Sequence, residues 1–340
     1  MRTIIIALIS VTLIACGGPG HPPPLVAVAG SEPSNTPSQA GSVAYWVVGR
    51  GLAVHIPYGS SAVSGASFRV AWDPGRALLY APTPAGSTYV VDPVARNATG
   101  VFPTIHGGRV AAFDLDNDLL LVLSNDSVAG YHAASHQRLF ADAVGGNALV
   151  VDRGNDRAFV GGNADSVVTQ VELSAGDVAR TFPVARSGDL VMADGRLFST
   201  DMKTGVVSSF DPDSGSITRT STDEVDPNFK YDAIKQANAG FMQLAVSADG
   251  DTVYAAGFSG RILAFDAATG ARTRTIRLEG AAQGDPRPKL SGLVVLPDGR
   301  ALTTAEDRGA TFLVDLSSGD IVRRTDGVAS NRWVLVNPAP

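Results

Sequence analysis

The sequence repeats one short pattern at a nearly constant spacing, and this repeat limits what the chain can fold into. At seven places an apolar run ends in a charged or turn-forming residue, and Val91-Asp92 and Phe265-Asp266 are clear examples. From Asp92 onward, the copies follow one another at intervals of 40, 40, 39, 55 and 49 residues. A period of this length is typical of the blades of a β-propeller, in which each repeat forms one four-stranded sheet.

Each copy has the same internal order: an apolar strand, a tight turn, two further apolar strands and a polar outer strand. The copy that starts at Gly240 shows this order best, because Asp249-Gly250-Asp251 separates two apolar runs. Asp-Gly between apolar runs indicates a hairpin, since both residues tolerate the positive φ of the turn. Four strands of about five residues fill roughly 40 residues, so we expect no helices between them.

The number of first strands decides whether the ring can close. Seven are predicted, starting at Phe68, Val110, Ala148, Leu190, Leu244, Leu293 and Trp333. The last has no chain left to complete its blade, but three strands are available near the other end, at 44–48, 52–56 and around 61–64. We therefore expect an all-β, seven-bladed β-propeller of four-stranded antiparallel blades, closed by pairing of C-terminal and N-terminal strands, with Trp333 beside Tyr45. Eight blades are the alternative.

The first 41 residues differ from the repeats. Residues 4–15 form an apolar segment that is too short to span a bilayer but suits a secretory signal. Leu13-Ile14-Ala15-Cys16 resembles a bacterial lipobox, in which the cysteine becomes the lipid-modified first residue, and Cys16 is the only cysteine in the chain. An ordinary signal followed by an incidental cysteine is the alternative.

A stretch rich in Pro, Gly and Ser follows Cys16 and is too poor in aromatic residues to build a core. We therefore expect a signal peptide at 1–15, a tether at 16–41 and one propeller domain at 42–340. Several acyl chains anchor a protein stably. The predicted location is extracytoplasmic, on a bacterial membrane, with membrane lipid as the partner of acylated Cys16.

The net charge of the chain disfavours one class of partner. The formal net charge is −6, and no run of basic residues interrupts this acidic background. Nucleic-acid binding is therefore disfavoured.

Two motifs have the spacing of metal ligands, but the repeat explains both. Asp114 to Asp118 resembles the start of a calcium loop, yet Leu119 replaces the glycine and Asn125 the glutamate that such a loop requires. His132 and His136 have the i, i+4 spacing of zinc ligands on a helix, whereas the repeat places them in a turn after a strand. We expect no metal site.

The sequence contains no Gly-x-Ser-x-Gly nucleophile elbow, so it assigns no catalytic residue. The segments that precede the first strands should lie on the face where the central channel opens. Gathered around that opening, their polar side chains would form a concave ligand-binding site biased towards anions: His106, Asn147, Arg186, Asn238, Lys289 and Arg332. The long connections 221–239 and 280–290 belong to the same face and either carry the binding role or are tolerated insertions.

Strand ends such as Tyr254-Ala255-Ala256-Gly257 and Leu121-Val122-Leu123-Ser124-Asn125 resemble those of the YVTN-type, lactonase-like bacterial propellers, and the resemblance covers about 42–340. Residues 264–270 also resemble the quinoprotein repeat motif, which continues to a tryptophan four residues after its glycine. Here that position is Arg274. We therefore expect no pyrroloquinoline quinone and no other cofactor.

The YVTN-type family includes surface and periplasmic binding proteins, lactone hydrolases and dehydrogenase subunits. The resemblance thus leaves two functions open. The first is a membrane-anchored, non-enzymatic binding or assembly scaffold, whose partner is an envelope protein or a small anionic ligand. The alternative is a lactonase-like hydrolase that acts on a small anionic or sugar lactone.

Overall fold

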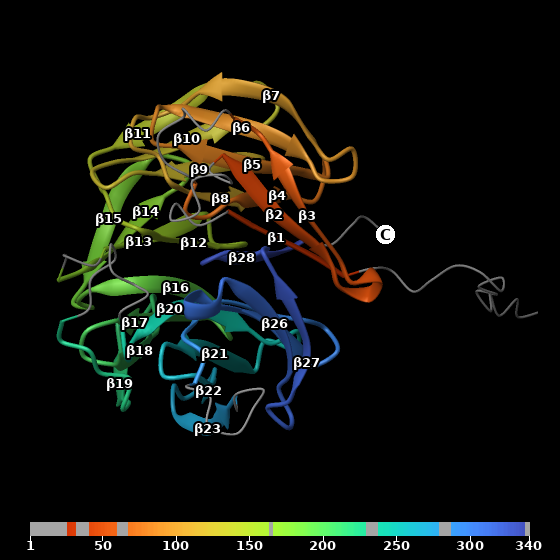
Figure 1. Ribbon diagram of the computed structural model, residues 1–340. Coiled ribbons are helices and arrows are strands. Elements are labelled where there is room, and N and C mark those ends of the chain that lie inside the picture. The colour runs from red at the N-terminus through yellow and green to blue at the C-terminus, as the bar shows by residue number, and fades with distance from the viewer. Residues whose placement is uncertain are drawn as a thin grey trace, which may run out of the picture.

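The computed structural model describes residues 26–31, 41–59, 67–162, 166–228, 237–278 and 287–336. In these residues, seven four-stranded antiparallel sheets stand as blades around one axis (Figure 1). The only helices in the described ranges are two 3-10 turns, η1 (Val48–Arg50) and η3 (Glu306–Arg308). The predicted all-β, seven-bladed β-propeller is therefore confirmed.

Six blades are continuous stretches of chain that run in sequence order from the axis to the rim. Blade 1 contains β4 (Ala71–Asp73), β5 (Leu78–Thr83), β6 (Ser87–Asp92) and β7 (Asn97–Pro103). Blade 2 contains β8 (Val110–Asp114), β9 (Leu119–Leu123), β10 (Val128–His132) and β11 (Arg138–Asp142). Blade 3 contains β12 (Ala148–Asp152), β13 (Arg157–Gly161), β14 (Val168–Glu172) and β15 (Asp177–Phe182).

The next three blades continue the ring. Blade 4 contains β16 (Ser187–Ala193), β17 (Arg196–Asp201), β18 (Val206–Phe210) and β19 (Ile217–Ser221). Blade 5 contains β20 (Phe241–Val246), β21 (Thr252–Gly257), β22 (Arg261–Asp266) and β23 (Arg272–Arg277). Blade 6 contains β24 (Leu290–Val295), β25 (Arg300–Ala305), β26 (Ala310–Asp315) and β27 (Ile321–Asp326).

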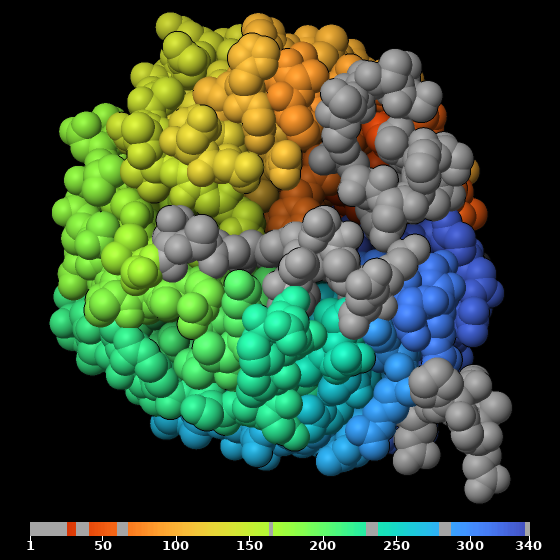
Figure 2. Space-filling model, turned by 60° about the vertical axis from the view of Figure 1, so that its left-hand side comes forward, coloured from red at the N-terminus to blue at the C-terminus, as the bar shows by residue number. Residues whose placement is uncertain are grey.

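The closing blade joins the two ends of the chain. Its strand order is β28-β1-β2-β3, made of β28 (Trp333–Val336), β1 (Ala27–Ser31), β2 (Ser42–Val47) and β3 (Leu52–Pro57). Figure 2 shows the result, with the red and orange N-terminal blades beside the blue C-terminal one. Closure removes the free sheet edges that an open array would expose.

The predicted partner of the last strand was wrong. Trp333 pairs with Gly30 of β1, and Tyr45 lies one strand further out, opposite Ala29. Strand β1 falls inside the stretch predicted as tether, whereas the expected strand around 61–64 lies outside the described residues. All five residues of β1 are buried, so this short apolar run between proline-rich segments is part of the core.

Burial follows position in the blade. All five residues of β9 are buried, whereas the first five residues of the rim strand β15 are exposed. Neighbouring blades pack their apolar faces together, as in the cluster of Tyr80, Phe102, Phe113 and Tyr131 between blades 1 and 2. Pro103 ends the rim strand β7, where its lack of a backbone N–H removes no hydrogen bond from the interior of the sheet.

Polar contacts join neighbouring blades at the face that carries the first turns. The contacts are Arg76 to Asp118 (2.5 and 2.7 Å), Asn117 to Asp156 (3.0 Å) and Arg157 to Asp213 (2.6 Å). These turn residues therefore hold blades 1 to 4 in register.

Candidate functional site

The six predicted site residues all lie in the connections that lead into first strands, just before β8, β12, β16, β20, β24 and β28. Every blade repeats the same antiparallel meander, so these connections meet at one end of the ring. We call this end the channel face. Its residues differ strongly in burial, and the structure does not draw all six into one pocket.

Two of the six residues meet at one carbonyl. Arg332 is only 1% exposed, and its Nη2 donates to the carbonyl oxygen of Gly188 at 2.9 Å. Asn147 donates to the same oxygen from its Nδ2 at 3.5 Å. The guanidinium of Arg332 also lies 4.7 Å from the ring centroid of Phe68. Arg332 is therefore part of the interior of the propeller rather than of its exposed rim.

Sequence reasoning missed the partner of Arg332, which is Asp189. This carboxylate is 1% exposed and lies 3.9 Å from Nε of Arg332 and 3.6 Å from Nη1 of Arg69. It also accepts the backbone N–H of Leu244 at 2.8 Å. Asp189 belongs to blade 4, whereas Arg69 leads into blade 1 and Arg332 into the closing blade, each three blades away. These contacts therefore cross the axis of the ring.

Gln243 extends this network to the next blades. Its Oε1 accepts the backbone N–H groups of Leu293 and Trp333, both at 2.8 Å, and its Nε2 donates to the carbonyl of Trp333 at 2.7 Å. We call Arg69, Asp189, Gln243 and Arg332 the axial cluster. It joins the first strands of blades 4 and 5 to both the start and the end of the ring.

A β-bulge in the first strand of blades 4 and 5 orients the side chains of Asp189 and Gln243. The pairing of the first strand shifts between Ser187 and Leu190 in blade 4 and between Phe241 and Leu244 in blade 5. A bulge of this kind leaves a residue unpaired and re-aims its side chain. Asp189 and Gln243 occupy the same position in these two bulges, and a bulge is difficult to predict from one sequence.

The other four predicted residues lie nearer the surface. Arg186 forms an ion pair with Asp201, at 2.9 Å, with 40% of its side chain exposed. His106 and Asn238 are exposed, and the His106 ring lies against Gly86. Lys289 is half-buried, and its backbone N–H donates to Asp307. Since carboxylates lie beside these groups, the channel face presents both charges rather than only cations.

The long connection after blade 4 carries a second group of residues that the sequence analysis did not single out. Glu224 is fully buried and accepts Nε of Arg261 in blade 5 at 2.8 Å and the hydroxyl of Ser259. Asp223 binds the same guanidinium, and this hydrogen bond holds the pKa of the Asp223 carboxyl below its usual range. The described part of this connection, up to residue 228, is thus anchored to blade 5 by charge.

A small cavity of about 190 Å³ lies along the first strands of blades 1 to 3 and the closing strand β28. Trp72, Val150 and Val334 contribute to its wall, with Arg69 at one end and Arg153 at the end of a first strand. Arg69 thus belongs both to the axial cluster and to the lining of this cavity.

The two metal-like motifs are turns of the repeat. Asp114 accepts the backbone N–H of Asp116 and the side-chain amide of Asn117, as in an ordinary Asx turn. His136 has a φ of 60°, and its ring stacks on Phe102 of blade 1 with 4.0 Å between centroids. Burial of the His136 ring lowers its pKa. In the described ranges, no three His, Cys, Asp or Glu side chains group as metal ligands.

Cys16 and the predicted signal peptide lie outside the described residues. None of the helices in the part of the chain that the structure describes is long and apolar enough to cross a bilayer.

Two blades of this propeller have a recognisable relative in sequence. Residues 223–325 match the PQQ_2 family, described as outer membrane protein assembly factor BamB. The match spans blades 5 and 6, so these blades form a BamB-like repeat domain. Arg274, which stands where the quinoprotein motif has tryptophan, lies inside it and donates to the carbonyl of Ser317 in blade 6. No curated protein matches the sequence.

Solved structures share the fold at low identity. U3-55K and the WD40 repeats of RRP9 each have a TM-score of 0.65 and 11% identity, with 79% of this chain covered and 84% and 83% of theirs. Hydrazine synthase of Kuenenia stuttgartiensis has a TM-score of 0.60 and 13% identity, with 74% of this chain and 77% of that chain covered. At such identities the likeness shows the propeller fold alone.

Proposed function

We propose that this chain is an extracytoplasmic lipoprotein whose propeller serves as a non-enzymatic scaffold and binds an envelope protein at its channel face. The observation that carries the proposal is the match of residues 223–325 to a family described by an outer membrane assembly factor. The lipobox-like Leu13 to Cys16 supports the same location, because acylation of Cys16 would keep the propeller at a membrane.

The chemistry of the channel face favours a protein partner over a small anion. Arg186 is paired with Asp201, and Arg332 is buried beside Asp189, so both charges are compensated within the molecule. What remains for contact is a polar surface with exposed His106 and Asn238. Surfaces of mixed charge are typical of protein interfaces, in which complementary charges set specificity and register.

Affinity capture of the full chain from crosslinked membranes tests this function. The test variant combines His106→Ala, Arg186→Ala and Asn238→Ala, and omits Arg332 because its replacement would disturb the interior. The matched control replaces the exposed Arg50 and Arg153, which lie in other turns, by alanine. We expect one envelope protein to be captured by the wild type and the control and lost from the test variant.

Capture that is equal for all three proteins, or no partner for any of them, would contradict the channel-face scaffold. If a pH-stat assay detected hydrolysis of any of a panel of lactones, and His106→Ala abolished it, this result would instead support the hypothesis of a lactonase-like hydrolase. The anchor is tested separately with Cys16→Ser, which should move the protein from the membrane fraction to the soluble fraction. An unchanged distribution would remove the lipoprotein part of the proposal.

A further inference from the structure

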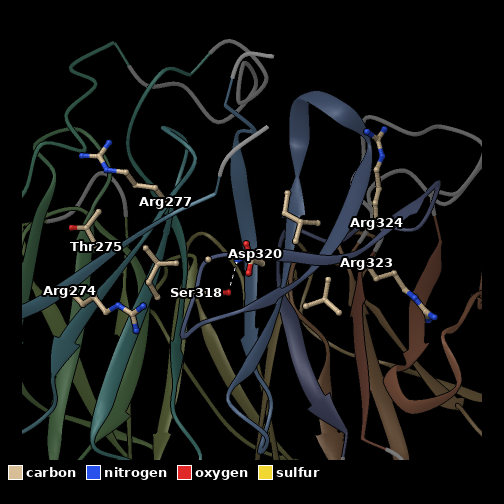
Figure 3. Close-up of a pocket in the computed structure, with 11 residues that line it drawn as sticks. Arg274, Thr275, Arg277, Ser318, Asp320, Arg323 and Arg324 are labelled. Atoms are coloured by element: carbon tan, nitrogen blue, oxygen red, sulfur yellow. Dashed lines mark hydrogen bonds between the residues drawn. The ribbon is translucent and has the colours of Figure 1, made fainter. Parts of the chain in front are cut away.

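A groove at the rim lies outside the channel face, between the outermost strands of blades 5 and 6. Its volume is about 740 Å³, and its walls are β23 and β27, with the turn Ser318-Gly319-Asp320 between them (Figure 3). Both walls are edge strands, so they have backbone N–H and C=O groups that no neighbouring strand occupies.

Positive charge is concentrated on these two strands. Together β23 and β27 carry five arginines and one carboxylate, Asp326, in a chain whose net charge is −6. None of the other outermost strands β3, β7, β11, β15 and β19 carries more than one arginine. Charged side chains on an edge strand discourage edge-to-edge aggregation, but the other outermost strands carry one arginine or none, so the excess on β23 and β27 needs another explanation.

The guanidinium groups on the walls have donors to spare. Arg274 binds the carbonyl of Ser317, and Arg324 binds Asp326 at 2.8 Å with 45% of its side chain exposed. Arg277 forms no ion pair or side-chain hydrogen bond with the residues that the structure describes. Each guanidinium offers five N–H donors in a fork that matches a carboxylate.

We propose that this groove binds an extended acidic segment of a partner protein, which pairs with the free edge of β23 and places its carboxylates on Arg274 and Arg324. Strand addition to an exposed edge is a recurring mode of peptide recognition, in which backbone pairing supplies affinity and side chains supply specificity. The mixed backbone and guanidinium surface favours a polypeptide over a lipid headgroup, which would use the charges alone. This site is independent of the channel face.

The probe is a short fluorescent peptide of alternating Glu and Val, and its control has Gln in place of Glu. Fluorescence anisotropy with the full chain should show binding of the Glu peptide only. Arg274→Glu with Arg324→Glu should weaken this binding at least about tenfold, since two surface ion pairs become repulsive. Arg50→Glu with Arg153→Glu changes the net charge equally and should leave affinity unchanged. Circular dichroism checks that both variants fold.

Hydrogen exchange supplies the second readout. Bound Glu peptide should slow the exchange of β23 amides in the wild type and in the channel-face variant. The inference is overturned if the Gln peptide binds equally, if both charge-reversal variants lose affinity equally, or if β23 gains no protection. Binding to vesicles of anionic phospholipid through the same arginines, without binding of the peptide, would overturn it in favour of a lipid surface.

Discussion

Arginine side chains gather in two parts of this molecule, at the axis and at the rim of blades 5 and 6, in opposite surroundings. At the axis, Arg332 and Asp189 are each 1% exposed and lie 3.9 Å apart. At the rim, Arg324 and Asp326 are closer, at 2.8 Å, but their side chains are 45% and 68% exposed. Water screens the rim pair, whereas an unpaired charge at the axis would remain desolvated. Burial, rather than distance, therefore decides how much the removal of one partner destabilises the fold.

Removal of the axial carboxylate tests whether burial makes this ion pair costly to disrupt. Asp189→Ala leaves Arg332 and Arg69 without their buried counter-ion and leaves the backbone N–H of Leu244 without its acceptor. Removal of one partner from a buried ion pair costs about 3–5 kcal/mol. Urea unfolding followed by circular dichroism should show a loss of this size.

Asp326→Ala is the matched control, because it removes the carboxylate of the rim pair. Its effect on the free energy of unfolding should stay within about 1 kcal/mol, as for other exposed ion pairs. Equal losses for Asp189→Ala and Asp326→Ala would show that burial does not separate the two regions.

The contact between Asp223 and the arginines of blade 5 lies between the two extremes and should respond to pH. Arg261, which donates to Asp223, lowers the pKa of this carboxyl, and Arg272 lies 3.6 Å away. An Asp with a lowered folded pKa stabilises the protein above its unfolded pKa of about 3.9, and this contribution is lost as the pH falls through the folded value. Because 63% of the Asp223 side chain is exposed, we expect only about 0.2–1 kcal/mol.

Unfolding of the wild type and Asp223→Asn at pH 7 and at pH 3 measures this contribution. The wild type should be the more stable protein at pH 7, and the difference should shrink at pH 3. A difference that does not change between the two pH values would mean that the charge of Asp223 is not its cause.

The repeat made the fold predictable because each blade is a local unit. Turn residues such as Asp249-Gly250 and apolar runs such as 119–123 mark strands within about ten residues, and the structure has strands on both sides of each turn. Strand β1 escaped prediction because Ala27 to Ser31 are mostly small and lie between proline-rich segments. Gly30 has no space for a side chain, since a Cβ there would overlap Oγ of Ser330 and the backbone carbonyl oxygen of Arg332. That requirement appears only when the ring is closed.

The candidate site was less predictable, because its geometry depends on contacts across the ring. The connections to first strands could be placed on one face from the repeat alone. The pairing of Arg332 with Asp189 joins residues 143 positions apart in sequence and depends on a bulge in β16. Glu224 could not be predicted either, since a carboxylate in a long polar connection is expected to be exposed to solvent. Only the structure shows Arg261 beside it.

The smallest change in the free energy of unfolding is expected for an arginine at the rim. Arg277→Ala removes an exposed guanidinium that has no partner among the described residues, and so leaves no buried group unsatisfied. The free energy of unfolding should change by no more than about 0.5 kcal/mol. Arg332→Ala, measured in parallel, removes the donor to Gly188 and the partner of Asp189 and should be clearly destabilising. If Arg277→Ala proved as destabilising as Arg332→Ala, the rim arginines would be part of the framework that holds blades 5 and 6 together, and their excess charge would no longer indicate a partner.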